Sequence, residues 1–168
     1  GYSGKIGTSL SGLTVGFSSV QKENAVVKKV FEQLSKAGVS CKWIKDAVPC
    51  DCKDVYKLIS AAEYSLTQAG EGSPLALAGR TILGECPAEL EGAYARASEI
   101  YAGLSKLFSE SCDVLVAITD EAVFEENLTI LPVVSGHPVF IQGNLACIGK
   151  MYDEETIIAV MAALEKGE

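Results

Sequence analysis

The sequence predicts an α/β fold built on a mixed sheet, with a strand-helix-strand start, a long central helix, a C-terminal hairpin and a final helix packed on the sheet. Three observations predict it. The hydrophobic pattern of residues 13–44 is that of a strand, then a helix, then a second strand, and the two strands of such a unit normally pair in parallel. Residues 112–118 (CDVLVAI) form a nearly continuous apolar run, typical of a strand buried on both faces. The 168 residues, 48% of them hydrophobic, fit one domain over 1–168, with 1–12 as a lead-in segment.

The first third of the chain supplies the strand-helix-strand unit. We expect strands over LTVGFSS (13–19) and VSCKWI (39–44). Between them, QKENAVVKKVFEQLSKAG has helical spacing and reaches Gly38, a usual helix stop. One face of this helix should carry Val26, Val27, Val30, Phe31 and Leu34.

The middle of the chain predicts further helices. After the loop VPCDC, Asp51 or Asp54 can cap a helix that runs to Gly70. The segment GEGSP (70–74) then breaks the chain before a short helical stretch, LALAGRTILG. The longest helix is expected over 88–110, with an apolar stripe that belongs to the core or to an interface. The apolar positions are Val55, Leu58, Ile59, Ala62 and Leu66 in the first helix, and Leu90, Ala93, Tyr94, Ala97, Ile100, Tyr101, Leu104 and Phe108 in the longest.

The C-terminal third predicts the rest of the sheet. The buried strand 112–118 is followed by an acidic loop, TDEAVFEEN. The segments PVFIQ and LACIG are separated only by Gly143–Asn144, a two-residue hairpin signal. A final helix over 153–166 begins with DEE, whose negative charges suit a helix N-terminus.

The charge balance limits the classes of partner. The net charge is −8, and the densest basic spot, Lys28–Lys29, fits the solvated face of a helix. A surface for nucleic acid or anionic membranes needs clustered Lys and Arg. No apolar run reaches the roughly 18 residues of a membrane span, and the chain does not start like a signal peptide. We therefore expect a soluble protein that binds no nucleic acid and has no membrane span.

Six cysteines raise the question of disulfides or a metal site: Cys41, Cys50, Cys52, Cys86, Cys112 and Cys147. Most lie among apolar residues, as buried free cysteines do. We predict reduced structural thiols and an intracellular, reducing compartment. The Cys50–Cys52 pair has no second Cys-x-x-C and no paired histidine, which disfavours zinc.

The only histidine, His137, stands between Gly136 and Pro138, and it could be a catalytic base or part of a sharp bend. No Gly-x-Ser-x-Gly motif presents a serine to it, and nothing selects one cysteine as a nucleophile. The glycine-rich segment GKIGTSLSG (4–12) precedes the first predicted strand, whereas a phosphate-binding loop follows a strand and precedes a helix. A cluster of carboxylates could hold a divalent cation or form a solvated loop, and we favour the loop. Its members are Asp120, Glu121, Glu125 and Glu126.

Several segments, in order, resemble the C-terminal half of the amidase signature family. They are SLSGLTVGFSS, VVKKVFEQLSKAGVSCKWI, ILGECPAELEGAYARASEIYAGLSKLF, DVLVAITD, NLTILPVVSGHPVFIQ and LACIGKMYDEETIIAVMAALEK. The resemblance covers roughly residues 8–166. In the family pattern a Gly-Leu-Pro step stands at 136–138, so His137 takes the place of a packing residue, which favours the bend.

The resemblance leaves out the family's chemistry. The catalytic lysine and two serines of the family lie in a Gly/Ser-rich core that precedes the matched region, and these 168 residues contain no Gly-Gly-Ser segment. The closest mimic, residues 8–12 (TSLSG), falls on the lead-in to a strand. The loops EAVFEEN and Gly143–Asn144 are shorter than in the family, and loops carry function. We therefore predict no catalytic, cofactor-binding or metal-binding residue, and no cofactor.

Three functions remain open. The chain is either a non-catalytic, amidase-derived structural or interaction subunit of a larger protein complex, or the C-terminal chain of a split amidase whose partner supplies the catalytic residues. An unrelated small-ligand-binding α/β protein is the third alternative. In the first two cases the partners are other protein subunits, because half of such a fold would expose an apolar surface. Gly1 in place of Met also fits a processed organellar chain, on the mitochondrial matrix side for example.

Overall fold

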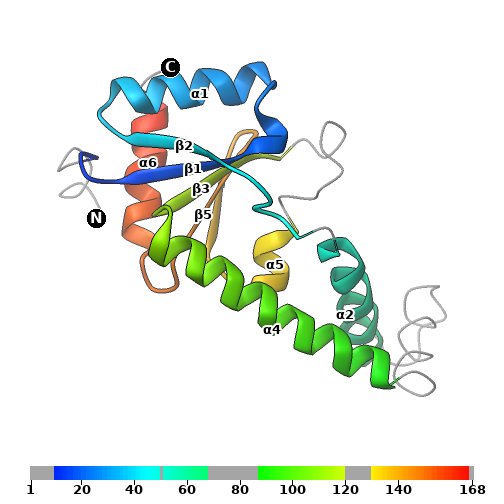
Figure 1. Ribbon diagram of the computed structural model, residues 1–168. Helices are drawn as coiled ribbons and strands as arrows, with labels where there is room; N and C mark the ends of the chain where they lie inside the picture. Colours follow the sequence, from blue (N-terminus) through cyan, green and yellow to red (C-terminus); the bar gives the residue numbers. More distant parts are fainter. Residues whose placement is uncertain (1–9, 50, 68–86, 120–129, 167–168) are drawn as a thin grey trace.

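The computed structural model describes residues 10–49, 51–67, 87–119 and 130–166, and these form three layers with the sheet in the middle (Figure 1). Helices α1 (Ala25–Lys36) and α6 (Glu154–Lys166) cover one face of the sheet. Helices α2 (Cys52–Thr67), α4 (Pro87–Glu110) and α5 (Leu131–Ser135) lie on the other side. The predicted α/β architecture is confirmed.

The sheet has five strands in the order β2-β1-β3-β5-β4. Strand β1 (Thr14–Ser18) runs parallel to β2 (Ser40–Ile44) and to β3 (Val114–Ile118). Strand β5 (Leu145–Gly149) is antiparallel to both β3 and β4 (Val139–Gln142). The sheet is therefore mixed, and the predicted hairpin over Gly143–Asn144 is confirmed.

Two hydrophobic clusters sit on opposite faces of the sheet, because alternate side chains of each strand point to opposite sides. In the buried strand β3, Val114 and Val116 join the cluster under α1 and α6, while Leu115 joins the cluster under α2, α4 and α5. All five residues of β3 are buried, which confirms the expectation drawn from the apolar run. The sheet is thus covered on both faces at its centre.

Three apolar residues assigned to buried helix faces are substantially exposed. Val26 is 39% exposed, whereas Val27, Val30 and Leu34 in the same helix are buried. Tyr94 and Tyr101 of α4 are 43% and 42% exposed, at the margin of the buried stripe. Helical spacing identifies a broad apolar face, but the width that is covered depends on the neighbouring elements. The stripe of α4 is therefore part core and part surface, with Ala93, Ile100, Leu104 and Phe108 buried.

Strand β3 begins at Val114, two residues later than the apolar run predicts. Asp113 explains the difference, because its carboxylate Oδ2 accepts a hydrogen bond from the Thr14 backbone N–H at 2.8 Å. Its own N–H donates to the Thr14 carbonyl at 2.7 Å. A side chain thus takes over a bond that a strand backbone would otherwise make.

Several predictions fall outside the described residues: the helical stretch LALAGRTILG, Cys50, Cys86, the four carboxylates at 120–126 and most of the lead-in segment. Within the described helices, none combines the length and the apolar composition that crossing a membrane requires.

Candidate functional site

The Gly-His-Pro step lies between α5 and β4, in a bend. Gly136 ends α5 in a left-handed conformation, with φ of 80°, and its N–H donates to the Pro132 carbonyl. A left-handed residue at this position is easiest for glycine. Pro138 then leads into β4. The bend turns His137 inward, where only 4% of its surface is exposed.

The imidazole of His137 links α5 to α4. Its Nε2 lies 2.9 Å from the hydroxyl of Ser105, and its Nδ1 lies 3.0 Å from the hydroxyl of Ser135. The ring stacks on Tyr101 at 4.8 Å between centroids and meets Phe108 at a tilt, at 5.5 Å. One nitrogen of a neutral imidazole donates and the other accepts, so the two serines can satisfy the ring without a charge.

This environment favours the neutral form of His137. Burial lowers the pKa of the imidazole below its ordinary value. The two hydroxyls are the ring's hydrogen-bond partners within the described chain, whereas a catalytic histidine is usually oriented by a carboxylate. The contacts are those of a packing residue in a bend, as the sequence led us to expect.

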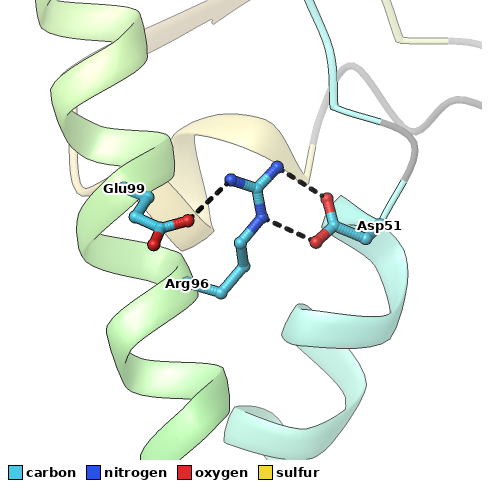
Figure 2. A network of polar contacts seen from close by, with 3 residues as sticks. All are labelled: Asp51, Arg96 and Glu99. Atoms are coloured by element: carbon cyan, nitrogen blue, oxygen red, sulfur yellow. Dashed lines mark hydrogen bonds and ion pairs between the residues drawn. The ribbon is translucent and has the colours of Figure 1, made fainter.

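A network of charges joins α4 to the start of α2 (Figure 2). Arg96 of α4 binds Asp51 in a bidentate pair, with Nε to Oδ2 at 2.6 Å and Nη2 to Oδ1 at 3.0 Å. Its Nη1 donates to Oε2 of Glu99 at 3.0 Å. The guanidinium lowers the pKa of Asp51, and the two carboxylates raise the pKa of Arg96. The sequence offers Asp51 or Asp54 as a cap for this helix; Asp51 directly precedes α2, and both of its carboxylate oxygens accept from Arg96.

A pocket of about 300 Å³ lies beside this network. It opens between the loop that follows β2, the middle of α4 and the first residue of α5. Aliphatic side chains of these elements form much of its wall, and Lys45, Asp46, Arg96 and Glu99 also line it. The pocket therefore combines an apolar interior with a charged rim. Its aliphatic residues are Ile44, Ile100, Leu104, Leu107 and Leu131.

The cysteines that the structure describes are free thiols. Burial raises the pKa of Cys52 and of Cys112 to about 11 and that of Cys147 to about 12, and it also raises the pKa of Cys41. Such thiols stay protonated near neutral pH and are poor nucleophiles. Among the described residues, no group of three His, Cys, Asp or Glu side chains could hold a metal ion.

Gln21 is a buried polar residue that no sequence motif singles out. It is 0% exposed and lies in the turn η1 (Ser19–Gln21), directly after β1. Its side-chain Nε2 donates to the Val116 carbonyl at 2.7 Å, and its Oε1 accepts from the Ile118 N–H at 3.1 Å. The amide thus continues the β1–β3 pairing beyond the last paired strand residues. Ligands frequently bind at the carboxyl ends of neighbouring parallel strands. At this end of β1 and β3, the Gln21 side chain occupies the backbone hydrogen-bonding groups of β3.

The edge of the sheet at β4 carries an apolar surface, which we call the β4 surface. It comprises Val139 and Ile141 of β4, which are 36% and 62% exposed. Val139 and Ile141 pair with Ile148 and Ala146, so they point toward the α4 side of the sheet.

The two edges of the sheet differ in character. Within the described residues β4 pairs with β5 alone, so its outer backbone groups have no strand partner. Its sequence, VFIQ, has no charge, whereas the opposite edge strand β2 carries the exposed Lys42. Charged residues commonly protect edge strands from pairing. The β4 edge lacks this protection.

Three solved structures share the fold. A glutamyl-tRNA(Gln) amidotransferase subunit from Thermotoga maritima aligns with a TM-score of 0.63 at 18% identity, over 96% of this chain and 44% of that chain. PAM12A aligns with a TM-score of 0.68 at 16% identity, over 98% and 45%. The 6-aminohexanoate cyclic dimer hydrolase, solved with substrate, aligns with a TM-score of 0.71 at 12% identity, over 99% and 47%.

The resemblance to amidase-family hydrolases is one of fold, at low sequence identity. No protein-family model and no curated protein matches the sequence. The chain spans less than half the length of each of the three solved proteins.

Proposed function

We propose that this chain is a non-catalytic, amidase-like subunit with a structural or interaction role in a larger protein complex. The fold corresponds to less than half of each of three solved proteins, among them a hydrolase and one component of an amidotransferase. A part of a larger fold has surfaces that the remainder would cover. The proposal is that other protein subunits cover such a surface here.

The observation that carries the proposal is the β4 surface. Ile141 and Val139 are 62% and 36% exposed, and they belong to an edge strand with no charged residue. Apolar surfaces of this kind mark interaction sites, and an open strand edge can pair with a segment of another chain. A protein partner that contributes apolar side chains and an extended segment would satisfy both features.

The interior residues give independent support. His137 uses both ring nitrogens for serine hydroxyls and its faces for aromatic contacts, and the described thiols have raised pKa values. Groups with nucleophilic or basic potential are thus used for packing. Free thiols also fit the proposed intracellular, reducing compartment, an organellar one included.

A split amidase is the second candidate, and the fold shared with a hydrolase supports it. In that case a partner chain would provide the lysine and both serines of the family's catalytic core. The two candidates share the partner surface and differ in chemistry.

Activity separates the two candidates. The purified chain, alone and with its co-purified partners, is assayed with amide and ester substrates and with a serine-directed phosphonate probe. The structural role predicts no hydrolysis and no labelling in either sample. Hydrolysis by the chain alone would contradict it, and hydrolysis that requires a partner with a Gly/Ser-rich core would support the split enzyme. Native mass spectrometry identifies the partners.

A pair of variants tests the surface itself. Ile141→Lys places a charge on the β4 surface, and Ser40→Lys places the same charge on the exposed opposite edge. We expect Ile141→Lys to release the partners while circular dichroism stays unchanged, and Ser40→Lys to leave the complex intact. Equal retention of partners in both variants would exclude the β4 surface as the contact.

A further inference from the structure

The pocket beside Arg96 has the form of a small-ligand site that the proposed scaffold role does not require. Its volume of about 300 Å³ is at the lower end of the range for ligand pockets, roughly 300–1,000 Å³. Three of its aliphatic wall residues, Ile100, Leu104 and Leu131, are at least 95% buried. A ligand there would lie against a buried aliphatic wall contributed by two helices.

The charges around the pocket select the kind of head group. Lys45 and Arg96 contribute two positive charges, while Asp46, Asp51 and Glu99 contribute three negative ones. The guanidinium of Arg96 already directs three N–H groups to carboxylate oxygens. A ligand carboxylate would therefore have to approach Arg96 between two like charges, and the exposed Lys45 is the other cation among the lining residues that could bind it.

A cationic head group meets a more favourable arrangement. Both carboxylate oxygens of Asp51 accept hydrogen bonds from Arg96, whereas Glu99 accepts one through Oε2. Glu99 is 67% exposed at the side chain, so a ligand ammonium can reach it. Asp46 is also exposed and adds a second carboxylate to the rim. Charge-assisted hydrogen bonds from ammonium to carboxylate are among the stronger polar contacts.

We propose that this pocket binds a small primary alkylammonium ligand. Its alkyl chain lies on the wall formed by Ile100, Leu104 and Leu131, and its ammonium group binds Glu99 at the rim, with Asp46 nearby. The chain length that fits is short, because the pocket is small. The role is binding, and it is independent of the surface at β4.

The test uses three probes of equal length with different heads: hexylammonium, hexanoate and hexanamide. Each is titrated into the full chain at pH 7, and the shifts of backbone amide resonances from α4 are followed by NMR. We expect saturable binding of hexylammonium that is at least tenfold tighter than that of hexanoate. Equal or tighter binding of hexanoate, or no saturable shift with hexylammonium, would overturn the proposal.

Two glycines of α4 provide matched variants. Gly103 lines the pocket and Gly92 does not, and a Cβ atom added at either position meets nothing within 4 Å. Gly103→Leu should fill the pocket and abolish binding, while Gly92→Leu should leave the affinity unchanged. Binding that survives Gly103→Leu would place the ligand elsewhere and refute the site.

A charge variant checks the head group. Glu99→Gln keeps the size of the side chain and removes its charge, and we expect about tenfold weaker binding of hexylammonium with little change for hexanamide. An unchanged preference for the ammonium probe in this variant would refute the role of Glu99. These outcomes are independent of whether the chain has protein partners, so the two proposals fail separately.

Discussion

Replacing His137 by leucine tests whether the imidazole is a packing residue. The substitution introduces at 136–138 the Gly-Leu-Pro step of the amidase pattern that the sequence resembles, and it removes the two ring hydrogen bonds, to Ser105 at 2.9 Å and to Ser135 at 3.0 Å. The hydroxyl of Ser135, a 5% exposed residue, loses the ring as a partner, although it still accepts from the backbone N–H of residue 137 at 3.4 Å, and such a loss typically costs about 1–3 kcal/mol. Ser105 is half-buried, so water can replace part of its bond. We expect His137→Leu to lower the free energy of unfolding by roughly 2–3 kcal/mol.

A second substitution should restore most of this loss. In His137→Leu/Ser135→Ala both side-chain partners of the ring bond are replaced by apolar groups, which is nearly neutral, and the backbone N–H of residue 137 loses only a long bond, at 3.4 Å. Urea unfolding followed by circular dichroism should place this double variant within about 1 kcal/mol of the parent. Ser109→Ala, on the exposed side of the same helix as Ser105, serves as the control. A double variant no more stable than His137→Leu would refute the reasoning.

The same residue sets a pH dependence. Burial lowers the pKa of His137 in the folded chain, so the unfolded chain takes up a proton first as the pH falls. The stability is therefore full above the unfolded pKa of about 6.5 and decreases as the pH falls toward the folded value. His137→Leu should lack this part of the decrease. An identical pH profile in the variant would assign the decrease to other groups.

Three further predictions concern stability. Gly149→Ala should destabilise the fold by about 1–3 kcal/mol in urea unfolding, because the new methyl would lie 2.6 Å from Cγ1 of Ile157, and a neutral result would contradict the close contact. Gln21→Leu should cost roughly 2–4 kcal/mol, because two buried backbone groups of β3 lose their partner, and calorimetry would show the lower melting temperature. Asp51→Asn should cost at most about 1 kcal/mol, since its pair with Arg96 is partly exposed. Because that pair lowers the pKa of Asp51, its contribution is present above about pH 4 and is lost on acidification, and a loss at neutral pH instead would be inconsistent with it.

Apart from the short elements η1 and α5, the order and type of the described elements followed from the sequence, because local periodicity reports which side of a segment is apolar. The run at 112–118 predicted a strand buried on both faces, and the Gly143–Asn144 step predicted the hairpin. Both depend on interactions within a few residues or on the overall apolar character of a segment. The bend at His137 was also predictable, from Gly136 and Pro138 on either side.

Only the tertiary structure decided which polar groups meet and which apolar residues stay outside. Arg96 and Asp51 are 45 positions apart, Gln21 and Val116 are 95 apart, and His137 and Ser105 are 32 apart. No periodicity in the sequence indicates these pairs, because a hydrogen bond joins two single residues that can stand at any distance along the chain. Exposure at Ile141 depends likewise on whether another element covers the edge of the sheet. Periodicity is a property of a single segment, whereas a hydrogen-bond partner or a covering element involves two segments. For this reason the sequence predicted the helices and strands, and the packing of these elements decided which side chains meet and which stay exposed.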